Sequence, residues 1–146
     1  MLRVIVGLLL LAGASAEGQR KVGPLVGIHY GAPLKWSAAV GVAVLASDST
    51  EKGFFIAGEP GLGGWRASVG WVRMTGNLGT GRVARVTLLR TEGRPWRAPR
   101  RATFVGAEYQ HMVIFALGAR LGAYYRVSAS EGERRGLMTA DVSLFL

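Results

Sequence analysis

The feature that most constrains this fold is an alternation of apolar and small side chains that runs along most of the chain after residue 22. In residues 113–127, VIFALGARLGAYYRV, the odd positions are apolar without a break. The even positions are mostly small and include Arg120 and Arg126. A period of two places successive side chains on opposite faces of a β-strand. The sequence therefore predicts strands rather than amphipathic helices.

Clusters of Gly, Pro, Asn, Asp and Ser divide the alternating pattern into eight segments. We expect strands at residues 24–31, 34–46, 53–58, 65–75, 82–91, 102–110, 113–127 and 137–146. Because the connections are short, consecutive strands should pair antiparallel. Eight such strands close naturally into a barrel, so the sequence predicts an all-β, eight-stranded antiparallel up-and-down β-barrel.

The two faces of the strands indicate which side of the barrel each would occupy. In residues 65–75, Trp65, Val69 and Trp71 alternate with Arg66 and small residues. A soluble barrel encloses its apolar face, whereas a membrane barrel turns that face to lipid and keeps a polar or small interior. The small faces here carry too few charges for a water-exposed surface, but they suit a narrow lumen. We therefore expect a transmembrane barrel.

Isolated polar residues on the small faces predict a network inside the barrel, because an unpaired buried charge is very costly. The expected lumen network consists of His29, Arg66, Arg85, Glu108, Arg120, Tyr124, Arg126 and Asp141. Arg120 in particular needs an acidic partner, and Glu108 and Asp141 are the candidates. Since these arginines outnumber the two acids, other polar groups must contribute.

Tryptophans and a basic connection predict contacts with a membrane surface. Trp65 and Trp71 share a face and lie about 20 Å apart along a strand, so they would reach two interfacial levels. The expected interfacial aromatic residues are Trp36, Trp65, Trp71 and Trp96. In the longest connection, RTEGRPWRAPRR, the expected contacts to anionic head groups are Arg94, Arg97, Arg100 and Arg101. The alternative for this segment is a solvated loop.

The first sixteen residues, MLRVIVGLLLLAGASA, have the organisation of a secretory signal peptide. Arg3 precedes a short apolar core, and Ala14-Ser15-Ala16 supplies the small-residue cleavage pattern. The core is well short of the about 20 residues that a spanning helix needs. We expect residues 1–16 to be removed, which leaves one barrel domain over residues 17–146. Without Arg3, 17 basic residues stand against nine acidic ones, and this excess indicates anionic partners.

The signal peptide, the eight alternating strands and the apolar last strand resemble small outer-membrane β-barrel proteins of Gram-negative bacteria. This architectural resemblance implies a location in the outer membrane and contacts with its lipid or lipopolysaccharide. It also implies that the barrel assembly machinery reads the last strand, GLMTADVSLFL. That recognition pattern usually ends in Phe, whereas here the chain ends in Leu146 and Phe145 lies one place earlier.

The sequence offers little for catalysis or metal binding. It has no cysteine and two histidines, of which we expect His29 in the lumen and His111 in a tight turn. Outer-membrane lipid A deacylases place a serine two residues after their histidine, but Gly31 and Val113 occupy those positions. We therefore expect no enzyme activity, no metal and no cofactor. A secreted chain is also not expected to bind nucleic acid.

Three functional hypotheses follow. The leading one is a non-enzymatic outer-membrane barrel with a side-chain-filled lumen and a structural or surface-interaction role, because eight strands leave room only for side chains. The second is a secreted soluble β-barrel that binds a small ligand or self-associates. The third is a lipid-modifying outer-membrane enzyme.

Overall fold

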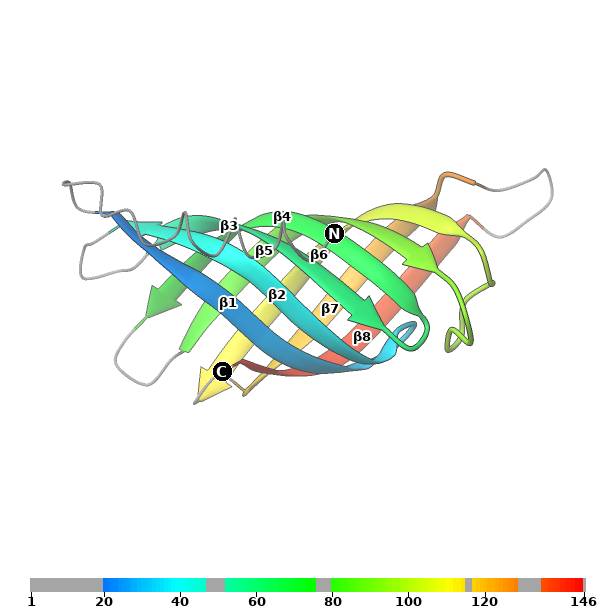
Figure 1. Ribbon diagram of the computed structural model, residues 1–146, viewed down its shortest axis with the longest axis horizontal. Helices are drawn as coiled ribbons and strands as arrows, with labels where there is room; N and C mark the ends of the chain where they lie inside the picture. Colours follow the sequence, from blue (N-terminus) through cyan, green and yellow to red (C-terminus); the bar gives the residue numbers. More distant parts are fainter. Residues whose placement is uncertain (1–19, 47–51, 76–79, 115–116, 129–134, 146) are drawn as a thin grey trace, which may run out of the picture.

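The computed structural model describes residues 20–46, 52–75, 80–114, 117–128 and 135–145. Eight strands form one closed barrel, in which each strand pairs antiparallel with the next and β8 pairs with β1 (Figure 1). The strands are β1 (Arg20–Gly31), β2 (Lys35–Ala46), β3 (Lys52–Gly61), β4 (Gly64–Thr75), β5 (Thr80–Thr91), β6 (Thr103–Ile114), β7 (Leu117–Arg126) and β8 (Gly136–Phe145). This confirms the all-β, eight-stranded antiparallel barrel. The expected signal peptide lies outside the described residues.

Most strand boundaries shift by a few residues from those expected, and two of the differences change where a functional residue or a connection lies. β3 continues to Gly61, so Glu59, which lay beyond the expected strand at residues 53–58, lies in a strand. Residues 113–127 do not form one strand, because β6 ends at Ile114 and β7 begins at Leu117. No Gly, Pro, Asn or Asp marks that connection, so the alternation by itself concealed it. His111 therefore lies within β6, with an exposed side chain, and the expectation of a turn position was wrong.

Side chains alternate sharply between the interior and the outer surface of the barrel. In β7 every second residue from Gly118 is buried, whereas Leu117, Leu121 and Tyr125 are each more than half exposed. The apolar face of the alternating pattern thus covers the outside, and the small, polar face lines the interior. Among the described residues, no helix has the length and apolar character needed to cross a membrane.

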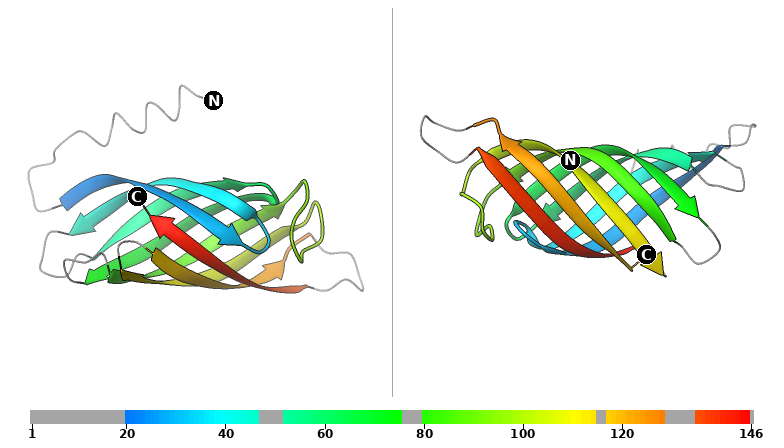
Figure 2. Two further views of the ribbon diagram at one scale, coloured as in Figure 1. Left: turned by 90° about the horizontal axis from the view of Figure 1, so that it is seen from below. Right: turned by 180° about the vertical axis from the view of Figure 1, so that it is seen from behind.

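The described connections lie together at one end of the barrel (Figures 1 and 2). The β1–β2, β3–β4, β5–β6 and β7–β8 connections share one end, which we call the loop end; β1 begins and β8 ends at the other, the terminus end. The first three connections are hydrogen-bonded to one another. The Gly63 amide donates to the Leu34 carbonyl at 3.0 Å, and the Trp96 amide donates to the Pro33 carbonyl at 2.9 Å. These bonds tie the loop end into one unit around the buried Leu34.

The interior of the barrel has three layers. An apolar cluster near the loop end contains Leu34, Leu89, Ala102, Phe104 and Tyr124. A second apolar cluster, toward the terminus end, contains Phe55, Ala57, Val72, Val83 and Met112. Six buried charged side chains lie between these clusters, whereas Arg126 lies opposite Phe104 at the level of the first cluster. The charged layer is therefore covered by apolar side chains at both ends.

Inward-facing glycines allow aromatic rings to lie flat against the barrel wall. A Cβ atom at Gly106 would overlap the ring of Tyr124, and one at Gly70 would overlap the ring of Phe55. In so narrow a lumen, glycine opposite a large side chain is a packing requirement rather than a turn signal. This accounts for two of the chain's 22 glycines by packing rather than by a turn.

Candidate functional site

The charged middle layer contains equal numbers of cationic and anionic side chains. Its members are Arg66, Arg85, Arg120, Glu59, Glu108 and Asp141, and none is more than 6 % exposed. Three positive charges face three negative charges, so this set is neutral as a whole. We call these six residues the lumen ion network.

Strand register creates one ion pair in each of three hairpins. The residues directly opposite one another are Glu59 and Arg66, Arg85 and Glu108, and Arg120 and Asp141. The shortest N–O distances within these pairs are 3.4, 3.2 and 2.6 Å. Opposite charges facing each other across an antiparallel pair stabilise the sheet. Each hairpin, β3–β4, β5–β6 and β7–β8, thus brings its own charge pair to the interior.

Arg120 is the centre of the lumen ion network. Its Nη1 and Nη2 atoms donate to the two carboxylate oxygens of Glu59 at 2.7 and 2.9 Å, in a bidentate pair. Its Nε and Nη2 atoms contact Asp141 Oδ2 at 2.8 and 2.6 Å. Bidentate, charge-assisted bonds are among the strongest that side chains form. Arg120 therefore connects β7 with its neighbour β8 and, across the lumen, with β3.

Arg66 forms the second connection across the lumen. Its Nη1 atom lies 2.7 Å from Asp141 Oδ2 and 3.5 Å from Glu108 Oε1. Its Nη2 atom donates to the backbone carbonyl of Ala32 at 3.2 Å. One guanidinium thus links β4 with β6, β8 and the β1–β2 turn.

Neutral polar side chains complete the network. Ser37 donates to Glu59 Oε1 at 2.6 Å, and Tyr124 donates to Glu108 Oε1. Arg85 donates to Gln110, whose amide nitrogen in turn donates to Ser143 at 2.7 Å. These contacts bring β2 into the same set of interactions.

All eight residues expected in the lumen have buried side chains. Six of them are brought together in the contacts just described: Arg66, Arg85, Glu108, Arg120, Tyr124 and Asp141. His29 and Arg126 are buried in the interior as well. The sequence interpretation missed Glu59, which gives the three arginines of the lumen ion network an equal number of acids. Glu59 continues the inward parity of Phe55 and Ala57, and that signal could have identified it.

The four tryptophans are divided between the two ends of the barrel. Trp36 packs on Tyr30 with 4.8 Å between ring centroids, and Tyr30 lies 6.3 Å from Trp96, all at the loop end. Trp65, near the start of β4, belongs to that end too, whereas Trp71 lies toward the terminus end. The arginines of the β5–β6 connection are exposed: Arg94, Arg97, Arg100 and Arg101. The Arg97 guanidinium stacks on Trp96 at 5.3 Å from the ring centroid.

The outer surface carries an apolar band around the whole barrel. Each strand carries an outward-facing large hydrophobic residue that is 42–63 % exposed: Ile28, Val40, Ile56, Val69, Val86, Val105, Leu121 and Val142. The charged, outward-facing side chains described in the strands lie within three residues of a strand end: Lys52, Arg73, Arg82 and Arg90. The outside of the barrel is thus free of described charges over its middle.

The lumen ion network is suited to holding the barrel wall together. Each of its acids is engaged by arginine, and among the described residues no group of three or more His, Asp or Glu side chains could hold a metal ion. His29 lies opposite Ser37 and Ser143 in register, and its side chain is buried in the interior of the barrel. Comparisons with protein-family models, curated proteins and solved structures found no match to this chain.

Proposed function

We propose that this protein is a non-enzymatic outer-membrane β-barrel with a filled lumen and a structural or surface-interaction role. The observation that carries the proposal is the inverted distribution of side chains, with six ionic groups buried inside and large apolar residues exposed outside. Monomeric soluble proteins rarely expose contiguous apolar patches larger than a few hundred Å². Lipid is the solvent that such a surface matches.

The dimensions of the strands support this proposal. The strands contain 10 to 12 residues. At about 3.3 Å per residue and a tilt of about 45°, they would cross about 23 to 28 Å, close to the height of a lipid-facing band. Trp36 and Trp65 near one end, and Trp71 and Tyr109 toward the other, would lie at the two interfaces. Both ends of the barrel domain would then lie on the periplasmic side, where the assembly machinery would read β8.

The loop end supplies the surface-interaction part of the proposal. Four exposed arginines of the β5–β6 connection flank Trp96 in the sequence, and hydrogen bonds to the neighbouring turns hold this segment in place. Guanidinium groups form bidentate hydrogen bonds with phosphate. We therefore assign Arg94, Arg97, Arg100 and Arg101 to the phosphates of lipopolysaccharide or outer-leaflet lipid.

Fractionation of cells should recover the protein with the outer membrane, in a form that needs detergent for extraction. A closed barrel stays compact in dodecyl sulfate until it is heated, so unheated samples should migrate faster on a gel than boiled ones. Recovery as a soluble, detergent-independent species would instead favour a secreted barrel whose apolar band is covered by further copies. The charged lumen gives no support to an apolar ligand inside the barrel.

The protein is expected to conduct no ions when it is inserted into planar lipid bilayers. Two apolar clusters and a fully paired charged layer occupy the lumen, and eight-stranded barrels have room only for side chains. A 16-stranded porin reconstituted in the same bilayers provides the positive control. Stepwise ion conductance by this protein would contradict a filled lumen.

A further inference from the structure

A row of basic side chains crosses the outside of the barrel near the terminus end. Lys52 of β3, Arg73 of β4, Arg82 of β5 and His111 of β6 lie opposite one another in consecutive strand pairs, and all four are exposed. Like charges directly opposite each other on one face destabilise a sheet. The row is therefore an unfavourable arrangement unless an anion accompanies it.

The contrast with the lumen indicates where that anion comes from. Each interior arginine of the lumen ion network is paired with a carboxylate, whereas no carboxylate in the described part of the chain forms a salt bridge with Arg73 or Arg82. The outer arginines thus keep their hydrogen-bond donors available. Within the described part of the chain no side chain supplies the counter-charge, which leaves a bound anion to supply it.

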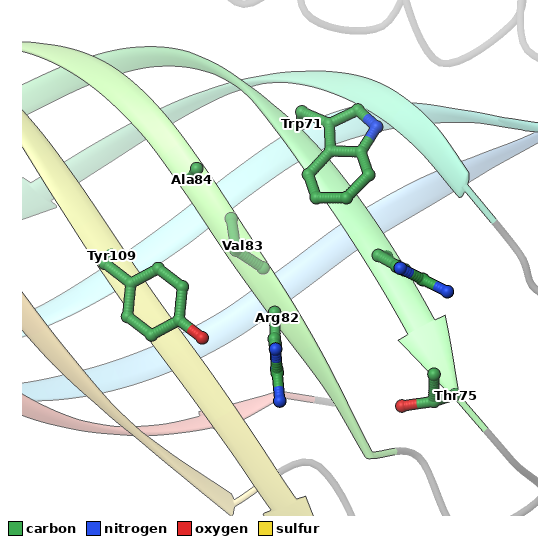
Figure 3. Close-up of a pocket in the computed structure, with 7 residues that line it drawn as sticks. Trp71, Thr75, Arg82, Val83, Ala84 and Tyr109 are labelled. Carbon is green, nitrogen blue, oxygen red and sulfur yellow. The ribbon is translucent and has the colours of Figure 1, made fainter.

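A groove of about 460 Å³ lies beside this row (Figure 3). Trp71 and Tyr109 stand on either side of Ala84, which lies opposite both of them in the register. The small side chain of Ala84 leaves an apolar floor between two aromatic walls. Arg73, Arg82 and Thr75 line the part of the groove nearer the strand ends. The groove is thus polar toward the terminus end and apolar toward the middle of the barrel.

We propose that this groove binds one anionic glycerophospholipid of the periplasmic leaflet. Its phosphate lies between Arg73 and Arg82, and one acyl chain lies over Ala84 between Trp71 and Tyr109. Guanidinium groups donate hydrogen bonds to phosphate oxygens. Aromatic rings are enriched at the membrane interface, where the head group and the acyl chain of a lipid meet. A free phosphate would leave the apolar part of the groove empty. The inference rests on the proposed membrane location, because the apolar band must face acyl chains.

Lipid quenching of a single tryptophan tests this site directly. Replacing Trp36, Trp65 and Trp96 by Phe leaves Trp71 as the reporter in the groove wall. The variant is folded into phosphatidylcholine vesicles that contain a minor fraction of either brominated phosphatidylglycerol or brominated phosphatidylcholine. Brominated phosphatidylglycerol should quench Trp71 more strongly than brominated phosphatidylcholine, and we call this preference the selectivity. The selectivity should fall about fivefold for each arginine neutralised in R73Q and R82Q.

Matched variants separate this site from general surface charge. The double variant Arg100→Gln/Arg101→Gln removes the same charge at the loop end and should keep the selectivity. Ala84→Leu keeps both groove arginines but fills the floor, and it should weaken quenching by the brominated anionic lipid. Equal quenching by the two brominated lipids, or full selectivity in Arg73→Gln/Arg82→Gln, would overturn the lipid site.

Two further results distinguish the alternatives. If neither brominated lipid quenches Trp71, the apolar band does not face acyl chains, and the proposed membrane location fails along with the site. If both quench equally, the membrane location stands and only the site is rejected. Inorganic phosphate at constant ionic strength should not reduce the selectivity; competition by phosphate would show that the groove takes the soluble anion instead.

Discussion

Replacing Glu59 by glutamine is expected to lower the free energy of unfolding by about 3–5 kcal/mol, the cost of breaking a buried ion pair by removing one partner. The Glu59 carboxylate accepts hydrogen bonds from Ser37, Arg66 and Arg120. Glutamine keeps the shape of the side chain but leaves three buried arginines with two acids. The amide nitrogen would also face the Arg120 guanidinium, so two donors would meet where a donor and an acceptor met before.

Urea unfolding of the folded protein in lipid vesicles, followed by tryptophan fluorescence, measures this loss. The matched control is Glu92→Gln, because Glu92 is a half-exposed acid that lies 3.5 Å from Arg90. A pair so open to solvent contributes little, and its loss should change the free energy of unfolding by less than about 1 kcal/mol. Equal unfolding midpoints for Glu59→Gln and the unmodified protein would show that the lumen ion network does not hold the barrel together.

Replacing Val69 by arginine is expected to destabilise the barrel in a bilayer by about 2–4 kcal/mol, because the new charge would lie near the bilayer midplane. Val69 faces outward in the middle of β4 and is 57 % exposed. Its neighbours in the register, Ile56 and Val86, are also apolar and exposed. No acidic side chain described on the outer surface is near enough to neutralise the arginine.

The control for this substitution lies at the end of the same strand. Thr75 faces outward like Val69 but is the last residue of β4, so Thr75→Arg should cost only about 0–1 kcal/mol near the interface. Unfolding midpoints of both variants in phosphatidylcholine vesicles give the comparison. In a soluble barrel both positions face water, and both substitutions would stay within about 0.5 kcal/mol of neutral. Equal, small effects would therefore reject the lipid-facing assignment.

The strands and their two faces could be predicted from the sequence because each depends on neighbours in the chain. A period of two assigns alternate side chains to opposite faces whatever the strand pairs with. The inward parity of Arg66, Arg85, Arg120 and Asp141 followed from that period. The boundary between β6 and β7 could not be found in this way, since the alternation continues through a connection without turn-forming residues. Glu59 was missed for the opposite reason: Pro60 and Gly61 are turn-forming residues, but they lie inside a strand that continues to Gly61.

The amino-acid sequence is enough to predict the all-β barrel, the apolar and polar faces of its strands, and most of the charged residues of its interior. Which of those residues meet depends on the three-dimensional arrangement of the strands. Arg120 and Glu59 are 61 residues apart and lie on strands that are not neighbours. Their contact depends on closure of the sheet and on the stagger of its strands, and no local period encodes either. The same holds for the groove at Ala84, where register across three strands places two aromatic walls and two arginines around one small side chain.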